Sequence, residues 1–360
     1  MASIVSLVFV SAYIYLQHPK FGSTPSGVRL ERIRQSRNYY VDKFRNQTET
    51  PTFAEGHTFW SELGKSLFKK YAHRVPGHPI PSVKRDLKNL PIDSTVVVWF
   101  GHSSCFIQIN RKKILIDPIF GENASPIPGS VKAFEGTTSY STGDMPDIDY
   151  LLISHDHYHH LDYETVVTLK DKVKHVICGL GVGAHLERWG YVENRIVEMD
   201  WYDIMTRDSA FTIHALPARH KSGRGLKQND TLWLSFLIRS PQTSIYISGD
   251  GGYDKHFAEI GEKFGPIELA IMENGQYDSA WHYVHLLPEE TLLASRDLGA
   301  KQVLPVHHSK FVLARHPWYE PLDRLSKTDK SIKIVTPVIG EIVYLNAPNQ
   351  VFERWWDVNQ

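Results

Sequence analysis

Four histidines fall within six consecutive positions in the middle of the chain, at His155, His157, His159 and His160. The apolar stretch at residues 149–154 is typical of a buried strand, so we expect the histidines where a strand ends and a loop begins. His155 and His157 point to the same side of an extended segment, whereas Asp156 between them points away. Imidazoles held together on one loop can bind two neighbouring metal ions. The alternative is a solvated, His-rich loop.

Three later segments also place a metal-binding residue type after an apolar run. His220 follows one such run, Asp250 follows residues 244–248 and is flanked by glycines, and His307 follows residues 302–305. Taken singly, His220 or His307 would be an ordinary histidine. Because they form an ordered series at successive strand ends, we expect them to converge with the histidine cluster on one metal site.

The elements that position these residues alternate between strands and helices. The sequence predicts strands at residues 94–100, 106–109, 113–116, 149–154, 173–178, 196–199, 210–215, 232–238, 244–248, 269–272, 302–305 and 332–337. It predicts helices at residues 163–169, 183–189, 253–264, 288–298 and 321–327. Strands dominate both halves, which suits a sandwich of sheets with helices outside.

The order His-x-His-x-x-His, a lone His, Gly-Asp and a second lone His resembles the metallo-β-lactamase superfamily. Within it, the closer match is to the N-acyl-phosphatidylethanolamine-hydrolysing phospholipase D branch and its bacterial relatives. The likeness covers roughly residues 90 to 325 and is carried by residues 99–104, 114–120, 154–162, 248–253, 264–266, 285–290 and 306–307. It implies an α+β fold, a four-layer αββα sandwich of two mixed sheets flanked by helices.

Carried over position by position, the resemblance implies two divalent metal ions, with zinc expected and iron or manganese as alternatives. Asp250 would bridge the two ions. The other ligands would be His155, His157 and His220 for the first ion, and His160 and His307 for the second.

Three further residues match positions near the centre of that family. Asp117 would orient a ligand histidine from behind, as ligand imidazoles usually require, and His102 would lie beside it. His285 would contact the scissile group of the substrate, and Asp250 could accept a proton. Ordinary hydrogen-bonded histidine is the alternative interpretation of His102 and His285.

His159 departs from the family pattern, in which this position is an aspartate that ligates the second metal. Imidazole binds the same ions, so His159 can replace that aspartate as a neutral ligand. The second site would then carry one negative charge fewer, which changes its metal preference. The alternative is that the second site is weak or empty.

A hydroxide held between two cations is a nucleophile near neutral pH, because the metals lower the pKa of water towards about 7. The resemblance favours hydrolysis of an N-acyl-phosphatidylethanolamine-type phospholipid, by cleavage of phospholipase D type. One alternative is a lactonase or another soluble ester or phosphodiester hydrolase using the same site. Another is a metal-binding protein without hydrolytic activity.

Composition narrows the class of partner. The chain has 40 Lys and Arg residues and 40 Asp and Glu residues, and a nucleic-acid binder would usually carry a basic excess. We therefore expect no nucleic-acid partner, but a small-molecule or phospholipid substrate. Two cysteines argue against a disulfide scaffold. The sequence carries no signal for an oligomeric state.

The N-terminus carries an uncharged apolar run at residues 4–16, which is short for a spanning helix of about 20 residues. We interpret it as a membrane anchor or signal, which predicts a membrane-associated protein that is otherwise cytoplasmic; an N-terminal helix or strand packed on the domain is the alternative. The expected organisation is an anchor at residues 1–18, an extension at 19–90, a catalytic domain at 91–345 and a tail at 346–360.

Overall fold

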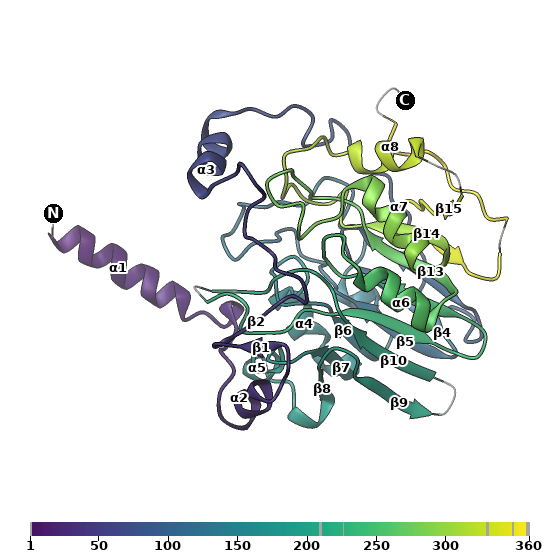
Figure 1. Ribbon diagram of the computed structural model, residues 1–360, viewed down its shortest axis with the longest axis horizontal. Helices are drawn as coiled ribbons and strands as arrows, with labels where there is room; N and C mark the ends of the chain where they lie inside the picture. The colour runs from purple at the N-terminus through teal and green to yellow at the C-terminus, as the bar shows by residue number, and fades with distance from the viewer. Residues whose placement is uncertain (1, 209–210, 226, 329–330, 348, 358–360) are drawn as a thin grey trace.

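The computed structural model describes residues 2–208, 211–225, 227–328, 331–347 and 349–357, and its two large sheets pack face to face (Figure 1). The first sheet has the order β16-β3-β4-β5-β6-β7-β8. Its strands are β3 (Val96–Trp99), β4 (Cys105–Ile109), β5 (Lys112–Ile116), β6 (Ile148–Ile153), β7 (Val173–Gly179), β8 (Ile196–Met199) and β16 (Ile342–Tyr344).

The second sheet has the order β15-β14-β13-β12-β11-β10-β9. Its strands are β9 (Ile204–Asp208), β10 (Phe211–Leu216), β11 (Ser235–Arg239), β12 (Ser244–Ile247), β13 (Ile267–Glu273), β14 (Ala300–Val306) and β15 (Lys333–Ile334). Both sheets are mixed, since β5 to β8 and β12 to β15 pair in parallel and the remaining pairs are antiparallel.

Three apolar clusters define four layers. One cluster lies between the sheets and contains Trp99 and Ile213. The second joins the first sheet to α4 (Tyr163–Leu169) and α5 (Gly183–Arg188), and the third joins the second sheet to α6 (His256–Phe264), α7 (Pro288–Asp297) and α8 (Glu320–Lys327). Because both faces of each sheet are covered, central strands such as β3 and β12 are rich in apolar residues. The αββα sandwich predicted from the sequence is confirmed.

Parallel pairing explains why the candidate ligands follow strands. The carboxyl ends of neighbouring parallel strands meet at one edge of a sheet, where ligands are usually bound in such folds. In the first sheet β5 and β6 end there, and in the second sheet β12, β13 and β14 do. The two edges therefore supply the residues of one centre.

Some predicted boundaries were wrong for identifiable reasons. The strand expected at residues 232–238 begins at Ser235, because the Leu232 and Leu234 amides donate instead to the carbonyls of Leu180 and Ser154 in the first half of the molecule. The expected strand at 332–337 shortens to β15, and the expected helix at 253–264 begins at His256. Residue 210, the predicted start of β10, lies outside the described residues.

The N-terminal apolar run forms the helix α1 (Ala2–Leu16), which projects away from the two sheets (Figure 1). Across the described part of the chain, no helix combines the length and apolar character needed to cross a membrane. Leu7, Phe9 and Ile14 are exposed, so the alternative of a helix packed along the domain is wrong for these side chains.

The extension contains α2 (Gly27–Arg34), the short hairpin β1 (Tyr39–Tyr40) and β2 (Lys43–Phe44), and α3 (Phe59–Phe68). Ile33 and Phe44 are fully buried in the cluster between the sheets. In the tail, Trp356 is buried in the same cluster. The boundaries proposed at residues 90 and 345 stay predictions.

Candidate metal centre

The histidine loop after β6 meets the ends of three segments of the second half. The Leu234 amide donates to the Ser154 carbonyl at 2.8 Å, which ties the start of this loop to the second half of the molecule. The loop then brings its imidazoles to the residues that follow β10, β12 and β14. Every ligand residue predicted from the sequence belongs to one buried cluster of side chains: His155, His157, His159, His160, His220, Asp250 and His307.

The first half of the centre consists of His155, His157 and His220, whose ligand nitrogens lie within 4.8 Å of one another. Nε2 of His155 is 2.9 Å from Nδ1 of His157, and Nε2 of His220 is 3.3 Å from the same atom. The far nitrogen of His220 faces the Val284 carbonyl at 2.9 Å. Three nitrogens that converge in this way fit a zinc-like cation.

The second half contains His159, His160 and His307, together with His102. Nε2 of His102 is 3.0 Å from Nδ1 of His159. Burial lowers the pKa of His102 and of His159 well below the usual value, so both rings are neutral and carry a free lone pair. The structure thus brings His102 into the cluster itself.

Asp250 lies between the halves. Its Oδ2 is 3.0 Å from Nε2 of His160, 3.1 Å from Nε2 of His307 and 3.9 Å from Nε2 of both His155 and His220. Among the described residues, its buried Oδ1 has no hydrogen-bond partner. A carboxylate with one oxygen among four imidazoles and the other unpaired fits a bridge between two cations.

Asp117, at the end of β5, lies behind the second half. Its carboxylate accepts the Ser154 amide at 2.8 Å and the Ser154 hydroxyl at 2.5 Å, and it faces Nδ1 of His160 at 2.8 Å. This is the contact that orients a ligand imidazole. The sequence placed Asp117 in this role, and the structure gives it the required neighbour.

Glu273 was missed by the sequence reasoning. It ends β13 fully buried, accepts the Gly251 amide at 2.7 Å and contacts Nδ1 of both His307, at 3.1 Å, and His285. The signal was present, because Glu273 follows the apolar residues 269–272 just as Asp250 follows its own strand. His285 is 13% exposed, which leaves it accessible from outside.

The carboxylates set the charge of the second half. Burial lowers the pKa of His160, but Asp250 and Asp117 outweigh it and raise this pKa to about 9. In the same way Asp250 and Glu273 outweigh burial and raise the pKa of His307 to about 10. In the first half burial prevails and lowers the pKa of His157 to about 3.

Three residues of the centre adopt left-handed backbone conformations although they are not glycine. The φ angles are +52° at His102, +40° at Asp117 and +67° at His307. Such conformations cost about 1–3 kcal/mol each and persist where the surrounding structure holds them. The surrounding structure therefore holds the backbone at these three positions.

Asp156 points away from the cluster, as the extended geometry predicts. It accepts the Gly223 amide at 2.6 Å and the Thr231 hydroxyl at 2.9 Å, and it faces Nε2 of His185 at 3.2 Å. Burial raises its pKa, but His185 and the hydrogen bonds outweigh this and lower the pKa to about 2. Asp156 therefore anchors the loop rather than binding metal.

The N-terminal segment contacts the same anchor. The buried Arg224 donates to the carbonyls of Asp156 at 2.9 Å, Leu161 at 2.6 Å and Lys20 at 2.7 Å. Gly22 packs so closely against His185 that an added Cβ would lie 2.1 Å from Nδ1 of the ring. Residues 20–22 thus reach the histidine loop through one layer of side chains.

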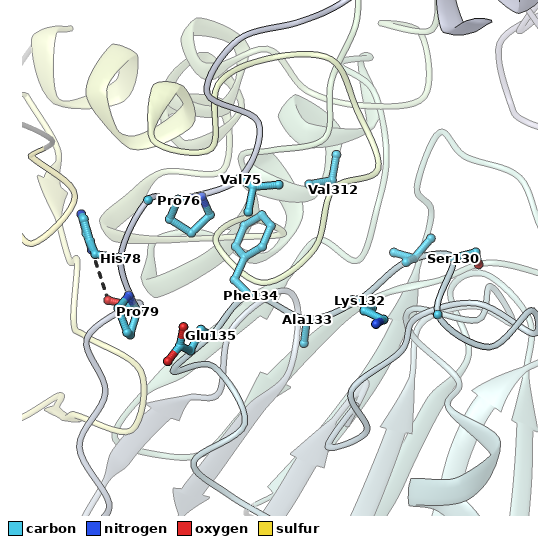
Figure 2. Close-up of a pocket in the computed structure, with 13 residues that line it drawn as sticks. Val75, Pro76, His78, Pro79, Ser130, Lys132, Ala133, Phe134, Glu135 and Val312 are labelled. Carbon is cyan, nitrogen blue, oxygen red and sulfur yellow. Dashed lines mark hydrogen bonds between the residues drawn. The ribbon is translucent and has the colours of Figure 1, made fainter.

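One hollow of the structure is separate from this centre. A cavity of about 460 Å³ is lined by residues 75–79, 129–135 and Val312, and none of the clustered histidines borders it (Figure 2). Another, of about 600 Å³, is lined by residues that include His282 and Leu287, which flank His285 in the chain. None of the clustered histidines lines the second cavity either.

Comparison with known proteins agrees with this geometry. The sequence profile of the "Beta-lactamase superfamily domain" matches residues 112–308. An uncharacterised protein of Mycobacterium tuberculosis is 34% identical over 330 residues, which is 89% of this chain and 88% of that protein. The N-acyl-phosphatidylethanolamine-hydrolyzing phospholipase D 1 of Caenorhabditis elegans is 27% identical over 77% of this chain and 86% of its own length.

Solved structures agree at the level of the fold. Igni18, a metallo hydrolase from the archaeon Ignicoccus hospitalis, superposes with a TM-score of 0.53 at 20% identity, covering 70% of this chain and 98% of its own. The profile match spans more than half of the sequence and includes the histidine loop and His307. The chain belongs to the metallo-β-lactamase superfamily of metal-dependent hydrolases.

Proposed function

We propose that this chain is a phosphodiesterase of phospholipase D type, which hydrolyses N-acyl-phosphatidylethanolamine-type phospholipids with two bound divalent ions. The observation that carries the proposal is Asp250, whose Oδ2 lies 3.0–3.9 Å from four imidazoles while its Oδ1 lacks a partner among the described residues. The phospholipase relative from Caenorhabditis elegans supports the substrate class.

Two bound cations would activate a water molecule and neutralise charge on the phosphoryl oxygens. His155, His157 and His220 would hold one ion, and the imidazoles beside Asp250 would hold the other. Zinc is the expected metal, because neutral imidazoles dominate the donor set; iron and manganese are the alternatives.

We assign His285 the role of contacting the substrate. Its ring lies 5.2 Å from that of His220 and 5.4 Å from that of His307, measured between centroids, so it faces both halves of the centre. Glu273 holds its Nδ1, which leaves Nε2 for a phosphoryl oxygen or for proton transfer to the leaving group.

The helix α1 supports an encounter with a lipid surface. Leu7, Phe9 and Tyr13 are each at least 65% exposed, and a contiguous exposed apolar surface is typical of a site that contacts a partner or a membrane. Replacing Phe9 and Ile14 with Asp should reduce co-sedimentation with phospholipid vesicles. Unchanged co-sedimentation would contradict a role of α1 at the membrane.

The test is a substrate panel with the zinc-loaded protein. We expect release of N-acylethanolamine and phosphatidic acid from N-acyl-phosphatidylethanolamine vesicles, measured by mass spectrometry. Turnover of a lactone or of bis-(p-nitrophenyl) phosphate alone would assign a soluble substrate to the same site. Full metal content with no turnover on the panel would identify a metal-binding protein without hydrolytic activity.

A further inference from the structure

His102 occupies a position that the sequence assigned to a supporting residue. Its ligand nitrogen and those of His159, His160 and His307 all lie within 4.8 Å of one another, and His102 itself is fully buried. The ring centroids of His102 and His307 are 4.2 Å apart. His102 is thus as close to the other imidazoles as they are to each other.

The backbone holds His102 against the opposite half of the molecule. Its amide donates to the His308 carbonyl at 3.1 Å, and the His307 amide donates to the His102 carbonyl at 2.9 Å. This reciprocal pair joins the loop after β3 to the end of β14. With left-handed φ angles at His102 and His307, the two rings are brought together by the main chain, not by a flexible side chain.

The His102 ring has a single polar contact among the described residues. Across the described residues its buried Nδ1 has no hydrogen-bond partner, and its Nε2 faces only Nδ1 of His159. Among the described residues neither ring nitrogen of His102 contacts a carboxylate or carbonyl, so Nε2 is left facing the other imidazoles of the cluster.

The spacing suits two ligands of one ion. Two nitrogens bound to a tetrahedral zinc at about 2.1 Å are separated by roughly 3.4 Å, and an octahedral edge is near 3.0 Å. Nε2 of His102 and Nδ1 of His159 are 3.0 Å apart. The replacement of the family aspartate by His159 therefore coincides with a second imidazole on the same side of the site.

We propose that His102 and His159 are both direct ligands of the second ion, so that this half holds its metal with four imidazoles and the shared Asp250. The proposal rests on the two-metal function proposed above and specifies its second site. A donor set with four neutral nitrogens and one carboxylate selects zinc, nickel or copper over manganese, because carboxylate oxygens are what manganese prefers.

The decisive measurement counts ligand imidazoles in the cobalt-substituted protein. Each imidazole bound to Co²⁺ contributes one paramagnetically shifted, solvent-exchangeable ring N–H signal in ¹H NMR. His102→Phe should remove one such signal and weaken the second cobalt by about 100-fold or more, a larger loss than the 10–100-fold expected for a supporting residue. An unchanged number of signals in this variant would overturn the proposal.

A second variant and a control separate ligand loss from misfolding. His102→Asn keeps a side chain that tolerates a left-handed backbone and should lose the same signal. His256→Phe removes a buried histidine outside the cluster and should keep every signal. Retention of the first cobalt with an unchanged circular dichroism spectrum shows that each variant is folded.

Metal competition tests the selectivity. His159→Asp should raise Mn²⁺ binding relative to Zn²⁺ at the second site by about tenfold or more, measured by elemental analysis after equilibrium dialysis against both ions. An unchanged ratio would contradict the proposed donor set. Neither measurement needs turnover. A protein that gives both expected results but hydrolyses no substrate would refute the proposed function alone. A protein that binds only one ion would refute the proposed function and the proposed second site together.

Discussion

The two halves of the metal centre use the same side chain in different surroundings. In the first half the far nitrogens of the imidazoles face neutral groups, the Ser154 hydroxyl at 3.0 Å for His155 and the Val284 carbonyl at 2.9 Å for His220. In the second half they face carboxylates, Asp117 for His160 and Glu273 for His307.

The difference shows which residues carry the negative charge of the second half. His159 removes an aspartate from the direct neighbours of the ion, but two buried carboxylates remain one imidazole further away. Such carboxylates raise the basicity of the histidines they contact, which strengthens them as ligands. They also raise the affinity of these histidines for protons, so that protons and metal compete in this half.

The largest effect is expected where the halves meet. Asp250→Asn should reduce kcat by about 10³-fold or more, because loss of a bridging charge removes several kcal/mol of stabilisation. Both ions should also bind more weakly, as elemental analysis of the dialysed protein would show. Retained turnover would contradict the bridging role.

Removing a ligand of the second half should release its ion and leave the ion of the first half bound. His159→Ala should lower bound metal from about two ions per chain to about one, since the first half keeps its three imidazoles. Elemental analysis of the dialysed variant checks this, with His220→Ala as the matched loss in the first half. Unchanged metal content in His159→Ala would show that this side chain is not a ligand.

The carboxylates behind the second half should tune its affinity. Glu273→Gln should weaken the second ion by about 10–100-fold and leave the first nearly unchanged. Isothermal titration with Zn²⁺ resolves the two events, and Asp117→Asn provides the comparison on His160. If Glu273→Gln lowered the Zn²⁺ affinity of both sites equally, the two halves would not differ in the way described.

Acidification should affect the halves differently. Protons compete for His160 and His307 below their raised pKa values of about 9 and 10, so affinity for the second ion should fall as pH drops from 8 to 6, by about tenfold per pH unit for each proton released. The pKa of His157, about 3, predicts little change of the first ion in this range. Zn²⁺ titrations at pH 6, 7 and 8 test the contrast.

The smallest effect concerns the anchor of the loop. Asp156→Asn should destabilise the fold by about 1–3 kcal/mol in urea unfolding at pH 7 without changing metal stoichiometry. The lowered pKa of Asp156 means that its contribution is present above the unfolded pKa of about 3.9 and is lost as pH falls towards 2. A variant that loses metal but not stability would place Asp156 among the ligands instead.

The sequence predicted the residues that are of a metal-binding type and also directly follow an apolar strand. The ligands follow apolar strands, so the rule that strand ends meet brought seven side chains together from separate segments. Glu273 obeys the same rule but is a common residue at such ends, and only its contacts with His307 and His285 distinguish it. The placement of His102 depends on a backbone pair with His307 and His308 across two sheets, which no local pattern encodes.

The secondary structure was likewise predicted in part. Strands in the middle of the sheets were predicted closely; β4, for example, spans Cys105–Ile109 and is buried throughout, where residues 106–109 were expected. The edge strand β8 has the expected bounds Ile196–Met199, but the edge strands β9 and β16 were missed, because edge positions need neither length nor a continuous apolar run. The start of β11 depends on backbone amides that donate hydrogen bonds to carbonyls in the first half of the molecule. The pattern of apolar residues along the chain does not predict such bonds.

The contact of residues 20–22 with Arg224 and His185 has a practical consequence. A shortened protein that begins near residue 91, where the catalytic domain is expected, would lack the residues that bury the guanidinium of Arg224. Water would then reach the side of the histidine loop that faces away from the metal centre. Proteolytic trimming of the leading segment would then act on the metal centre at a distance, and expression boundaries drawn from the superfamily match alone would yield a weakened protein.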